Sequence, residues 1–438
     1  MASDYVFSFS YEKLKKKKYL DDSHQAEYLI RYLAYLNAKT CVLEDKYVDK
    51  DYLVDYQKFY SRSFDEDGKF TTRIHFFEAK FSKDEFEETL ENNDTEYLRK
   101  SYLGFVVIRP IKGSDRKRLI GRTILKAYPE KEDSQKRVFV RDNYDVSLFG
   151  IPLSINSLPF QVQDQGVSAC ATIALWTALH PLAEPYGISR LSPAEITELA
   201  TAFPSESRKF PSSGLILEQM INCVKSMDLD VETINVENIN DDEVILTAIK
   251  AYVKANLLLI GALKLTKKNG NETGYHAVTI SGYRCDTNGK LTELYVHDDQ
   301  IGPYHRVKPD GCFTHWKNEW TDRRGYDEVI LEKMLIPIYP KIRLPFARIY
   351  PRYLEIKERM INDYGDDLDF ELYLTTITKY KAFLLESTLK GKRKVLITSL
   401  PRFLWVLRSY SDGKPLKDLV FDGTSIYPKP LTSVEFKV

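Results

Sequence analysis

The sequence has little cysteine, no long apolar segment and no excess of either charge. Its 438 residues include five cysteines, an odd number without regular spacing, which argues against a disulfide framework and favours a reducing cytoplasm. No run of eighteen apolar residues occurs and the start lacks a basic-then-apolar leader, so we expect no membrane span and no secretion signal. Lys plus Arg and Asp plus Glu number 63 each, which gives no bulk attraction to nucleic acid or to a membrane surface.

Motifs for common cofactors are also missing. The sequence has no glycine-rich phosphate loop, no paired CxxC and no His/Glu metal motif, so we expect no nucleotide, metal or other cofactor. Aromatic residues are abundant instead: 29 Tyr and 22 Phe provide core mass and suit grooves for extended peptides. A chain of 438 residues is long enough for two or three domains.

The most informative segment runs from Gln163 to Trp176, where a glutamine and a glycine turn lead into a cysteine. The residues after Cys170 are almost all apolar, which predicts a buried helix that is capped by Ser168 and ends at Pro181. Unpaired N–H groups and the dipole at a helix start favour a thiolate. Gln165, five residues before the cysteine, is suited to join the Cys170 N–H as a second oxyanion donor.

A histidine and two aspartates follow further along the chain. Residues 274–283 predict a strand with His276 near its start, and residues 291–296 predict a second strand that forms a hairpin with the first. This hairpin returns Asp298 and Asp299 to the neighbourhood of the histidine. A nucleophile, a base and an orienting carboxylate are the groups that a thiol hydrolase needs.

The register of this hairpin decides which aspartate faces His276. A two-residue turn closed by Thr287 and Lys290 brings Asp299 to the face of the histidine. A one-residue shift brings Asp298 there instead, because strand side chains alternate with period two. We favour Asp298 because it ends the strand directly, and Asp299 stays the alternative.

In these motifs the chain resembles the papain-like cysteine peptidases, most closely the bacterial branch that includes the double-glycine leader peptidases of exporters. The Asp-Cys-Gly-x-x-Cys opening of that branch is similar to residues 164–170, although the spacing differs by one residue. Its Gly-His-x-Val-x-x-x-Gly block is similar to residues 274–282, with Tyr275 added, and its Asp-Pro block is similar to residues 298–302. The resemblance covers roughly residues 155 to 310.

The resemblance implies a role for each residue. Cys170 is the nucleophile, His276 the base, Asp298 the orienting acid and Gln165 the oxyanion glutamine. Gln163 stays an alternative, because Gln165 is one residue nearer to the cysteine than in the papain pattern. The implied activity is hydrolysis of peptide or isopeptide bonds in a peptide or protein substrate. The alternatives are an inactive interaction protein that retains the fold, and a transamidase or deamidase that uses the same triad.

The expected fold class is α+β with three units. We expect a papain-like core at residues 151–338, in which the nucleophile helix packs on an antiparallel sheet. An N-terminal α/β domain at residues 1–150 and a C-terminal α/β extension at residues 339–438 flank it. The N-terminal domain has no catalytic motif of its own, so its expected role is substrate recognition or the binding of a regulatory partner.

The C-terminal extension continues without family resemblance. Its apolar spacing predicts helices around residues 353–362 and 368–386. An apolar run at residues 395–398 predicts a buried strand.

Overall fold

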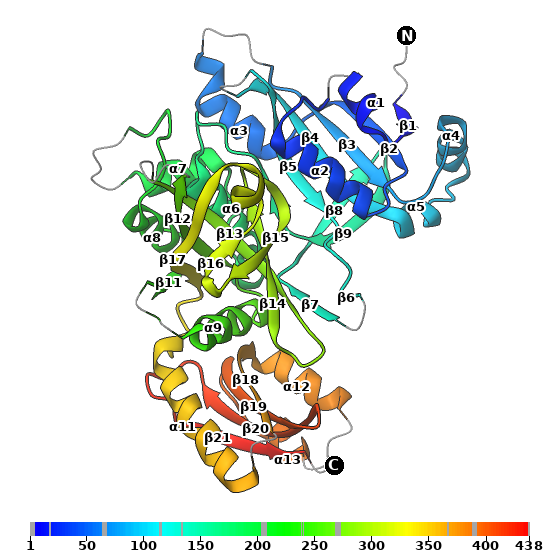
Figure 1. Cartoon of the computed structure of the whole chain (residues 1–438). Helices are drawn as coiled ribbons and strands as arrows, with labels where there is room; N and C mark the ends of the chain where they lie inside the picture. The colour runs from blue at the N-terminus through cyan, green and yellow to red at the C-terminus, as the bar shows by residue number, and fades with distance from the viewer. Residues whose placement is uncertain are drawn as a thin grey trace.

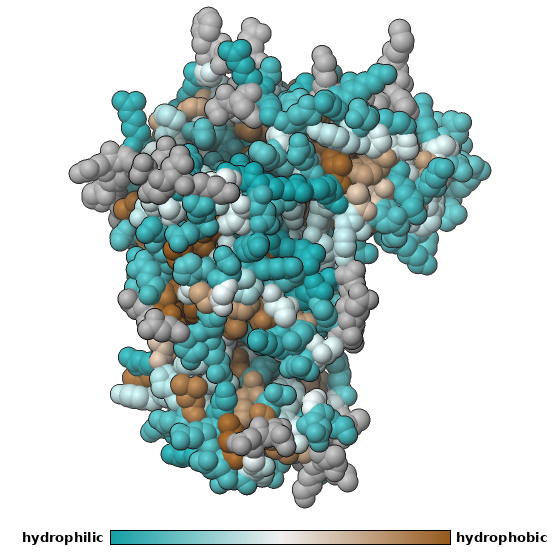
Figure 2. Space-filling model, in the orientation of Figure 1, coloured by the Kyte–Doolittle hydropathy of each residue, from teal (hydrophilic) through white to brown (hydrophobic). Residues whose placement is uncertain are grey.

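The computed structural model describes residues 5–16, 19–63, 68–113, 116–132, 135–202, 208–237, 239, 241–267, 273–365, 368–387 and 392–436. These residues form a mixed α/β protein with thirteen α-helices, and every strand pair among them is antiparallel (Figure 1). None of these helices is both long and apolar enough to cross a membrane. Figure 2 shows that the face in view is largely hydrophilic, with hydrophobic residues in small scattered groups.

The first sheet belongs to the N-terminal part of the chain and has strand order β1-β2-β3-β4-β5-β10. Its strands are β1 (Val6–Ser8), β2 (Thr40–Tyr47), β3 (Thr71–Phe77), β4 (Tyr102–Lys112), β5 (Arg118–Leu125) and β10 (Pro159–Phe160). The helices of this region are α1 (Tyr11–Lys16), α2 (His24–Tyr35), α3 (Lys50–Lys58), α4 (Lys83–Asn92) and α5 (Glu96–Ser101), with a short 3₁₀ helix η1 (Tyr60–Arg62).

The second sheet carries the middle of the chain, in the order β11-β17-β16-β15-β14-β13-β7-β6, with β12 pairing β13 and β17. Its strands are β6 (Lys131–Glu132), β7 (Gln135–Phe139), β11 (Asp230–Asn235), β12 (Leu259–Lys267), β13 (Thr273–Cys285), β14 (Leu291–Asp298), β15 (Gly302–Asp310), β16 (Cys312–Lys317) and β17 (Tyr326–Ile338). The helices are α6 (Cys170–Tyr186), α7 (Pro193–Ala200), α8 (Leu217–Lys225), α9 (Asp242–Lys254) and α10 (Glu319–Arg323).

Helix α6 is the buried helix that the sequence predicts after Cys170. Its residues from Ala171 to Ala183 are buried, and it packs on strand β13. Thr279 of β13 donates its hydroxyl to the carbonyl of Ala174 at 3.1 Å. A helix held on all sides in this way keeps its first residue in a fixed place.

The predicted end of this helix at Pro181 is wrong. The helix continues through Pro181 and Pro185 and ends at Gly187, which has φ 70° and donates its N–H to the carbonyl of Ala183. A glycine adopts this left-handed conformation without steric cost, so it terminates the helix more effectively than the prolines.

Each of the two sheets includes a strand from the other side of residue 150, and the two sheets share a core. Strand β10, which follows residue 150, pairs with β5, while β7, which precedes it, pairs with β13. The hairpin of β8 (Asp142–Leu148) and β9 (Ile151–Ser157) spans residue 150 itself. One apolar cluster includes Tyr32 of α2, Leu175 of α6 and Tyr304 of β15. The N-terminal sheet therefore packs directly on the middle of the chain, and the division into units stays a prediction.

The C-terminal part forms a four-stranded sheet, coloured orange to red in Figure 1. Its strands are β18 (Leu368–Thr376), β19 (Phe403–Ser411), β20 (Lys414–Asp422) and β21 (Pro430–Glu435), and its helices are α11 (Phe346–Tyr364), α12 (Ile377–Glu386) and α13 (Lys392–Ile397). Two expectations for this region are wrong. Residues 368–376 are a strand, because Leu372 and Leu374 alternate with polar neighbours, and residues 392–397 are a helix that buries Val395 alone.

Candidate active site

Asp298 and His276 are joined by a buried hydrogen bond. His276 Nε2 lies 2.9 Å from Asp298 Oδ1, and both side chains are 1% exposed. Asp298 Oδ2 accepts the indole N–H of Trp320 at 2.8 Å, and Oδ1 also accepts the backbone N–H of Gln300 at 3.0 Å. These donors favour the ionised carboxylate, which therefore fixes the imidazole through one of its nitrogens.

The register of the hairpin of β13 and β14 decides which aspartate faces His276. The hairpin closes with a hydrogen bond from the Asp286 N–H to the Lys290 carbonyl, so the two-residue turn that would favour Asp299 does not form. The register shifts by one residue and back again along the strands, and Thr279 pairs with His297. This pairing is displaced by one residue from the one that a two-residue turn would give, and it brings Asp298 to the histidine.

Cys170 is the first residue of α6, and its side chain is half-buried. The cap is Ala169 and makes no side-chain hydrogen bond, so the prediction that Ser168 caps the helix is wrong. The Ser168 hydroxyl donates to Asp164 Oδ1 at 3.2 Å instead. A cysteine at this position lies beside the unpaired N–H groups of the helix start, which can donate to a negative charge that develops there.

The imidazole of His276 interacts with Cys170 as well as with Asp298. Burial lowers the pKa of His276, but the charge of Asp298 and the hydrogen bonds to Asp298 and Cys170 outweigh burial and raise this pKa well above its usual value. Asp298 occupies Nε2, which leaves Nδ1 for the cysteine. The three side chains thus form a chain from thiol to imidazole to carboxylate.

Asp299 supplies a second buried carboxyl group at the same imidazole. Its Oδ1 lies 3.8 Å from His276 Nε2, beyond hydrogen-bonding distance. Among the residues that the structure describes, neither oxygen has a hydrogen bond of normal geometry, although the Gln163 N–H lowers the pKa of Asp299 somewhat. Burial, together with the charge of Asp298, raises the pKa of Asp299 to about 7. Burial alone would raise the pKa of Asp298, but the charge of His276 and the hydrogen bonds from His276 and Trp320 together outweigh burial and lower this pKa to about 2.

His276, Asp298 and Asp299 also form a group whose ligand-type atoms lie close enough together to hold a cation. Two of the three are already engaged: the histidine Nε2 binds Asp298, and both oxygens of Asp298 accept N–H donors. A cation would have to break these hydrogen bonds. The donor set therefore suits an oriented imidazole better than a metal.

The two candidate oxyanion glutamines lie on the loop before Cys170. Gln165 is exposed and has φ 60°, and its backbone N–H donates to the carbonyl of Ser168 at 2.9 Å. Gln163 is half-buried. In the part of the chain that the structure describes, neither side-chain amide has a hydrogen-bond partner. Both stay candidates for the oxyanion donor.

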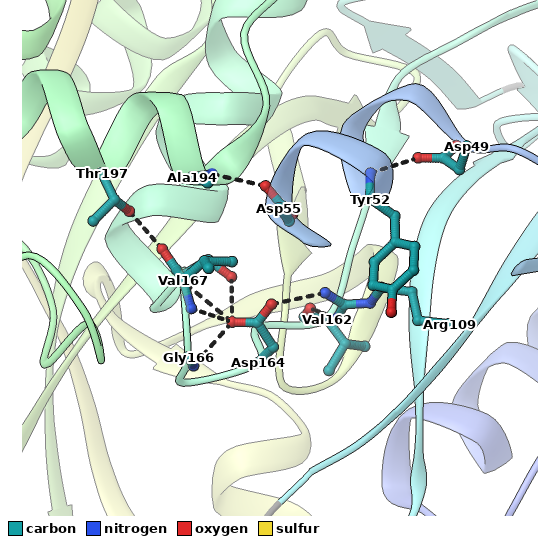
Figure 3. Close-up of polar contacts among 11 residues, drawn as sticks. Asp49, Tyr52, Asp55, Arg109, Val162, Asp164, Gly166, Val167, Ala194 and Thr197 are labelled. Atoms are coloured by element: carbon teal, nitrogen blue, oxygen red, sulfur yellow. Dashed lines mark hydrogen bonds and ion pairs between the residues drawn. The ribbon is translucent and has the colours of Figure 1, made fainter. Parts of the chain in front are cut away.

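Asp164 holds this loop in shape (Figure 3). Its Oδ1 accepts the consecutive backbone N–H groups of Gly166, Val167 and Ser168 at 3.0 to 3.1 Å. Its Oδ2 accepts from Arg109 at 3.0 Å. The sequence carried a signal for the turn, since an aspartate that precedes a glycine commonly accepts N–H groups of its own turn.

A polar cavity of about 180 Å³ lies beside this loop. Gln163, Gln165 and Gln300 line it from the middle of the chain, and Gln25 and Lys117 line it from the N-terminal part. The cavity therefore adjoins both candidate oxyanion glutamines and is formed jointly with the N-terminal part of the chain.

A second Cys–His contact was missed by the sequence analysis. Cys312 Sγ lies 3.2 Å from His315 Nδ1 and 2.9 Å from the hydroxyl of Thr314, all on strand β16. Within the described ranges no carboxylate hydrogen-bonds to this histidine, and the cysteine is not at a helix start. The pair lacks the environment of Cys170 and provides an internal control for it.

Comparison with known proteins finds a distant structural likeness. No family model matches the chain, and no curated protein matches it. Among solved structures it is similar to interpain A, a cysteine protease of Prevotella intermedia in its active wild-type form, with a TM-score of 0.24 and 14% sequence identity. The alignment covers 52% of this chain and 86% of that chain. A likeness this low carries no argument, so the interpretation of the site depends on its geometry.

Proposed function

We propose that this protein is a cysteine hydrolase that cleaves peptide or isopeptide bonds. The observation that carries the proposal is the single imidazole of His276, which interacts with the Cys170 thiol and is hydrogen-bonded to the buried Asp298. A thiol at a helix start, an imidazole and a carboxylate are the groups of a nucleophilic triad.

The proposed reaction is acyl transfer through a thioester. The Cys170 thiolate attacks the substrate carbonyl carbon, and the resulting oxyanion accepts hydrogen bonds from the Cys170 N–H and from the side chain of Gln165. The imidazolium of His276 donates a proton to the leaving amine as the C–N bond breaks. His276 then takes a proton from water, which attacks the thioester and releases the acid and the thiolate.

The finer assignments belong to the same proposal. The resemblance of residues 155 to 310 implies a papain-like core, related to the double-glycine leader peptidases, with a cytoplasmic peptide or protein substrate. We propose units at residues 1–150, 151–338 and 339–438 on the same basis. The polar cavity beside Gln165 supports a substrate that reaches across the junction with the N-terminal part of the chain.

A cleavage assay tests the proposal directly. The full chain is incubated with a diverse peptide mixture, and new termini are identified by mass spectrometry. Cys170→Ala is expected to abolish cleavage, while Cys312→Ala, which removes the other cysteine beside a histidine, is expected to leave it unchanged. Cleavage that persists in Cys170→Ala would overturn the proposal and favour the alternative that this protein is an inactive interaction protein.

A further inference from the structure

Arg109 connects the N-terminal sheet to the loop that precedes Cys170. It lies on strand β4, and its guanidinium donates to Asp164 Oδ2 at 3.0 Å and to the carbonyl of Val162 at 2.6 Å. The Arg109 and Asp164 side chains are 1% and 0% exposed. Figure 3 shows this guanidinium extending from its strand toward the loop. The pair is thus fully enclosed at the junction between the two sheets.

Asp164 links Arg109 to the backbone of the loop. Its other oxygen accepts three consecutive N–H groups, so one carboxylate sets the path of residues 166–168. That path determines where the Gln165 side chain starts and how the backbone enters helix α6 at Cys170. Both proposed oxyanion donors therefore depend on the position of this carboxylate.

Other contacts hold the loop from the opposite side. The hydroxyl of Thr197 donates to the Val167 carbonyl at 2.6 Å, and the Ser212 N–H donates to the Gly166 carbonyl at 2.9 Å. A Cβ on Gly166 would lie 2.9 Å from the Tyr60 hydroxyl, so the N-terminal part also packs tightly against the turn. The loop therefore has little room to adopt a second path when Arg109 is present.

We infer that Arg109 is a positioning residue for the oxyanion donors. The N-terminal sheet, which carries Arg109, therefore contributes to the proposed active site. The inference depends on the proposed function and deepens it. Arg109 does not touch the reacting atoms; it acts through Asp164. Removing it leaves the Asp164 carboxylate buried without its cation. An uncompensated buried charge is costly, so this carboxyl group would move toward water or take up a proton, and the loop backbone that it holds would shift with it.

Two reactions of the Cys170 thiol distinguish displaced oxyanion donors from a general loss of structure. Alkylation of Cys170 by iodoacetamide needs the thiolate but no oxyanion donor. Acylation by p-nitrophenyl acetate passes through a tetrahedral oxyanion: the C–S bond forms, the C–O bond to p-nitrophenolate breaks, and the thiol becomes a thioester. We expect Arg109→Met to slow acylation about 10- to 100-fold while alkylation changes less than about 3-fold. Equal effects on both rates, or no effect on either, would overturn the inference.

A matched pair elsewhere in the chain controls for loss of a buried cation. Arg408 binds Asp418 in the C-terminal sheet at 2.7 and 2.8 Å, with side chains 9% and 0% exposed. Arg408→Met is expected to lower the unfolding temperature but to leave both reactions of Cys170 unchanged. All rates are measured at a temperature at which circular dichroism shows each variant folded.

Two further variants keep the inference testable if Arg109→Met does not fold. Arg109→Lys retains the charge but makes fewer hydrogen bonds, so it should lose less acylation rate, and Asp164→Asn should slow acylation as Arg109→Met does. Normal acylation in Asp164→Asn overturns the inference. Failure of the proposed function gives a different result, because Cys170 of the unmodified protein would then be no more reactive than Cys312 in either reaction.

Discussion

Asp298 and Asp299 are consecutive, both are buried, and their carboxylates lie 2.9 and 3.8 Å from the same nitrogen of His276. Their pKa values nevertheless move in opposite directions. Asp298 accepts hydrogen bonds from the histidine, from Trp320 and from a backbone N–H, and its pKa is about 2. Asp299 lacks such donors, and burial raises its pKa to about 7. Asp298 is therefore the ionised partner that orients the imidazole, and Asp299 is a largely neutral neighbour at mildly acidic pH.

This difference predicts unequal effects of two isosteric substitutions. Asp298→Asn removes the charge that raises the pKa of His276, so we expect the alkylation rate of Cys170 at mildly acidic pH to fall about 100-fold or more. Asp299→Asn should lower the rate less than about 10-fold. The measurement is the pH profile of iodoacetamide labelling, and equal losses in the two variants would contradict the assignment.

Asp299 also predicts a pH dependence of stability. Its pKa in the folded protein is about 7, against an ordinary value of 3.8, so ionisation destabilises the folded state progressively as the pH rises from about 4 to 7. The side chain introduced by Asp299→Asn cannot ionise, so we expect this variant to gain about 3–4 kcal/mol of unfolding free energy relative to the unmodified protein between pH 4 and pH 8. Urea unfolding of both proteins at the two pH values measures this. A difference in unfolding free energy between the two proteins that does not change with pH would refute the prediction.

The hydrogen bond from Trp320 to Asp298 predicts that Trp320 affects the acylation of Cys170. Trp320→Phe keeps an aromatic ring against His276 but removes the N–H that binds Asp298 Oδ2, a hydrogen bond to a charged group worth about 1.5–3 kcal/mol. We expect the rate of Cys170 acylation to fall about 10-fold and its acid limb to move to higher pH, because Asp298 becomes easier to protonate. Trp316→Phe removes a comparable N–H bond, to the Phe313 carbonyl, and should change neither quantity.

The two glutamines before Cys170 predict different results in an acylation assay. If Gln165 is the oxyanion donor, Gln165→Ala slows acylation by p-nitrophenyl acetate about 100-fold while iodoacetamide labelling is retained. Gln163→Ala should then have little effect. The reverse order would assign the oxyanion role to Gln163, and no effect of either substitution would leave the Cys170 N–H as the main donor.

The elements around the site could be predicted because their signals are local. The continuous apolar run after Cys170 predicts a buried helix, and residues 274–283 and 291–296 lie within strands β13 and β14. Residues 368–376 were predicted as part of a helix, although Leu372 and Leu374 alternate with polar neighbours as in a strand, and pairing with β19 fixes this segment as one.

The remaining features depend on contacts between distant residues. The ion pair of Arg109 with Asp164 joins positions 55 residues apart, and no local sequence pattern predicts it. The register shift beside Gly282 also accompanies a close contact with a distant segment: a Cβ on Gly282 would lie 2.5 Å from the Val138 carbonyl of the neighbouring strand. Such close backbone approaches are visible only in three dimensions.

The central claim is that Cys170 and His276 form an activated thiolate pair, and intact-mass labelling tests it most directly. A limiting amount of iodoacetamide is added at mildly acidic pH, and the modified cysteine is identified in the unmodified protein, in Cys170→Ala and in His276→Ala, with His315→Ala as the matched control. We predict selective labelling of Cys170 that falls with His276→Ala and is unchanged by His315→Ala. Labelling spread over Cys170 and Cys312 and unaffected by His276→Ala would contradict the claim.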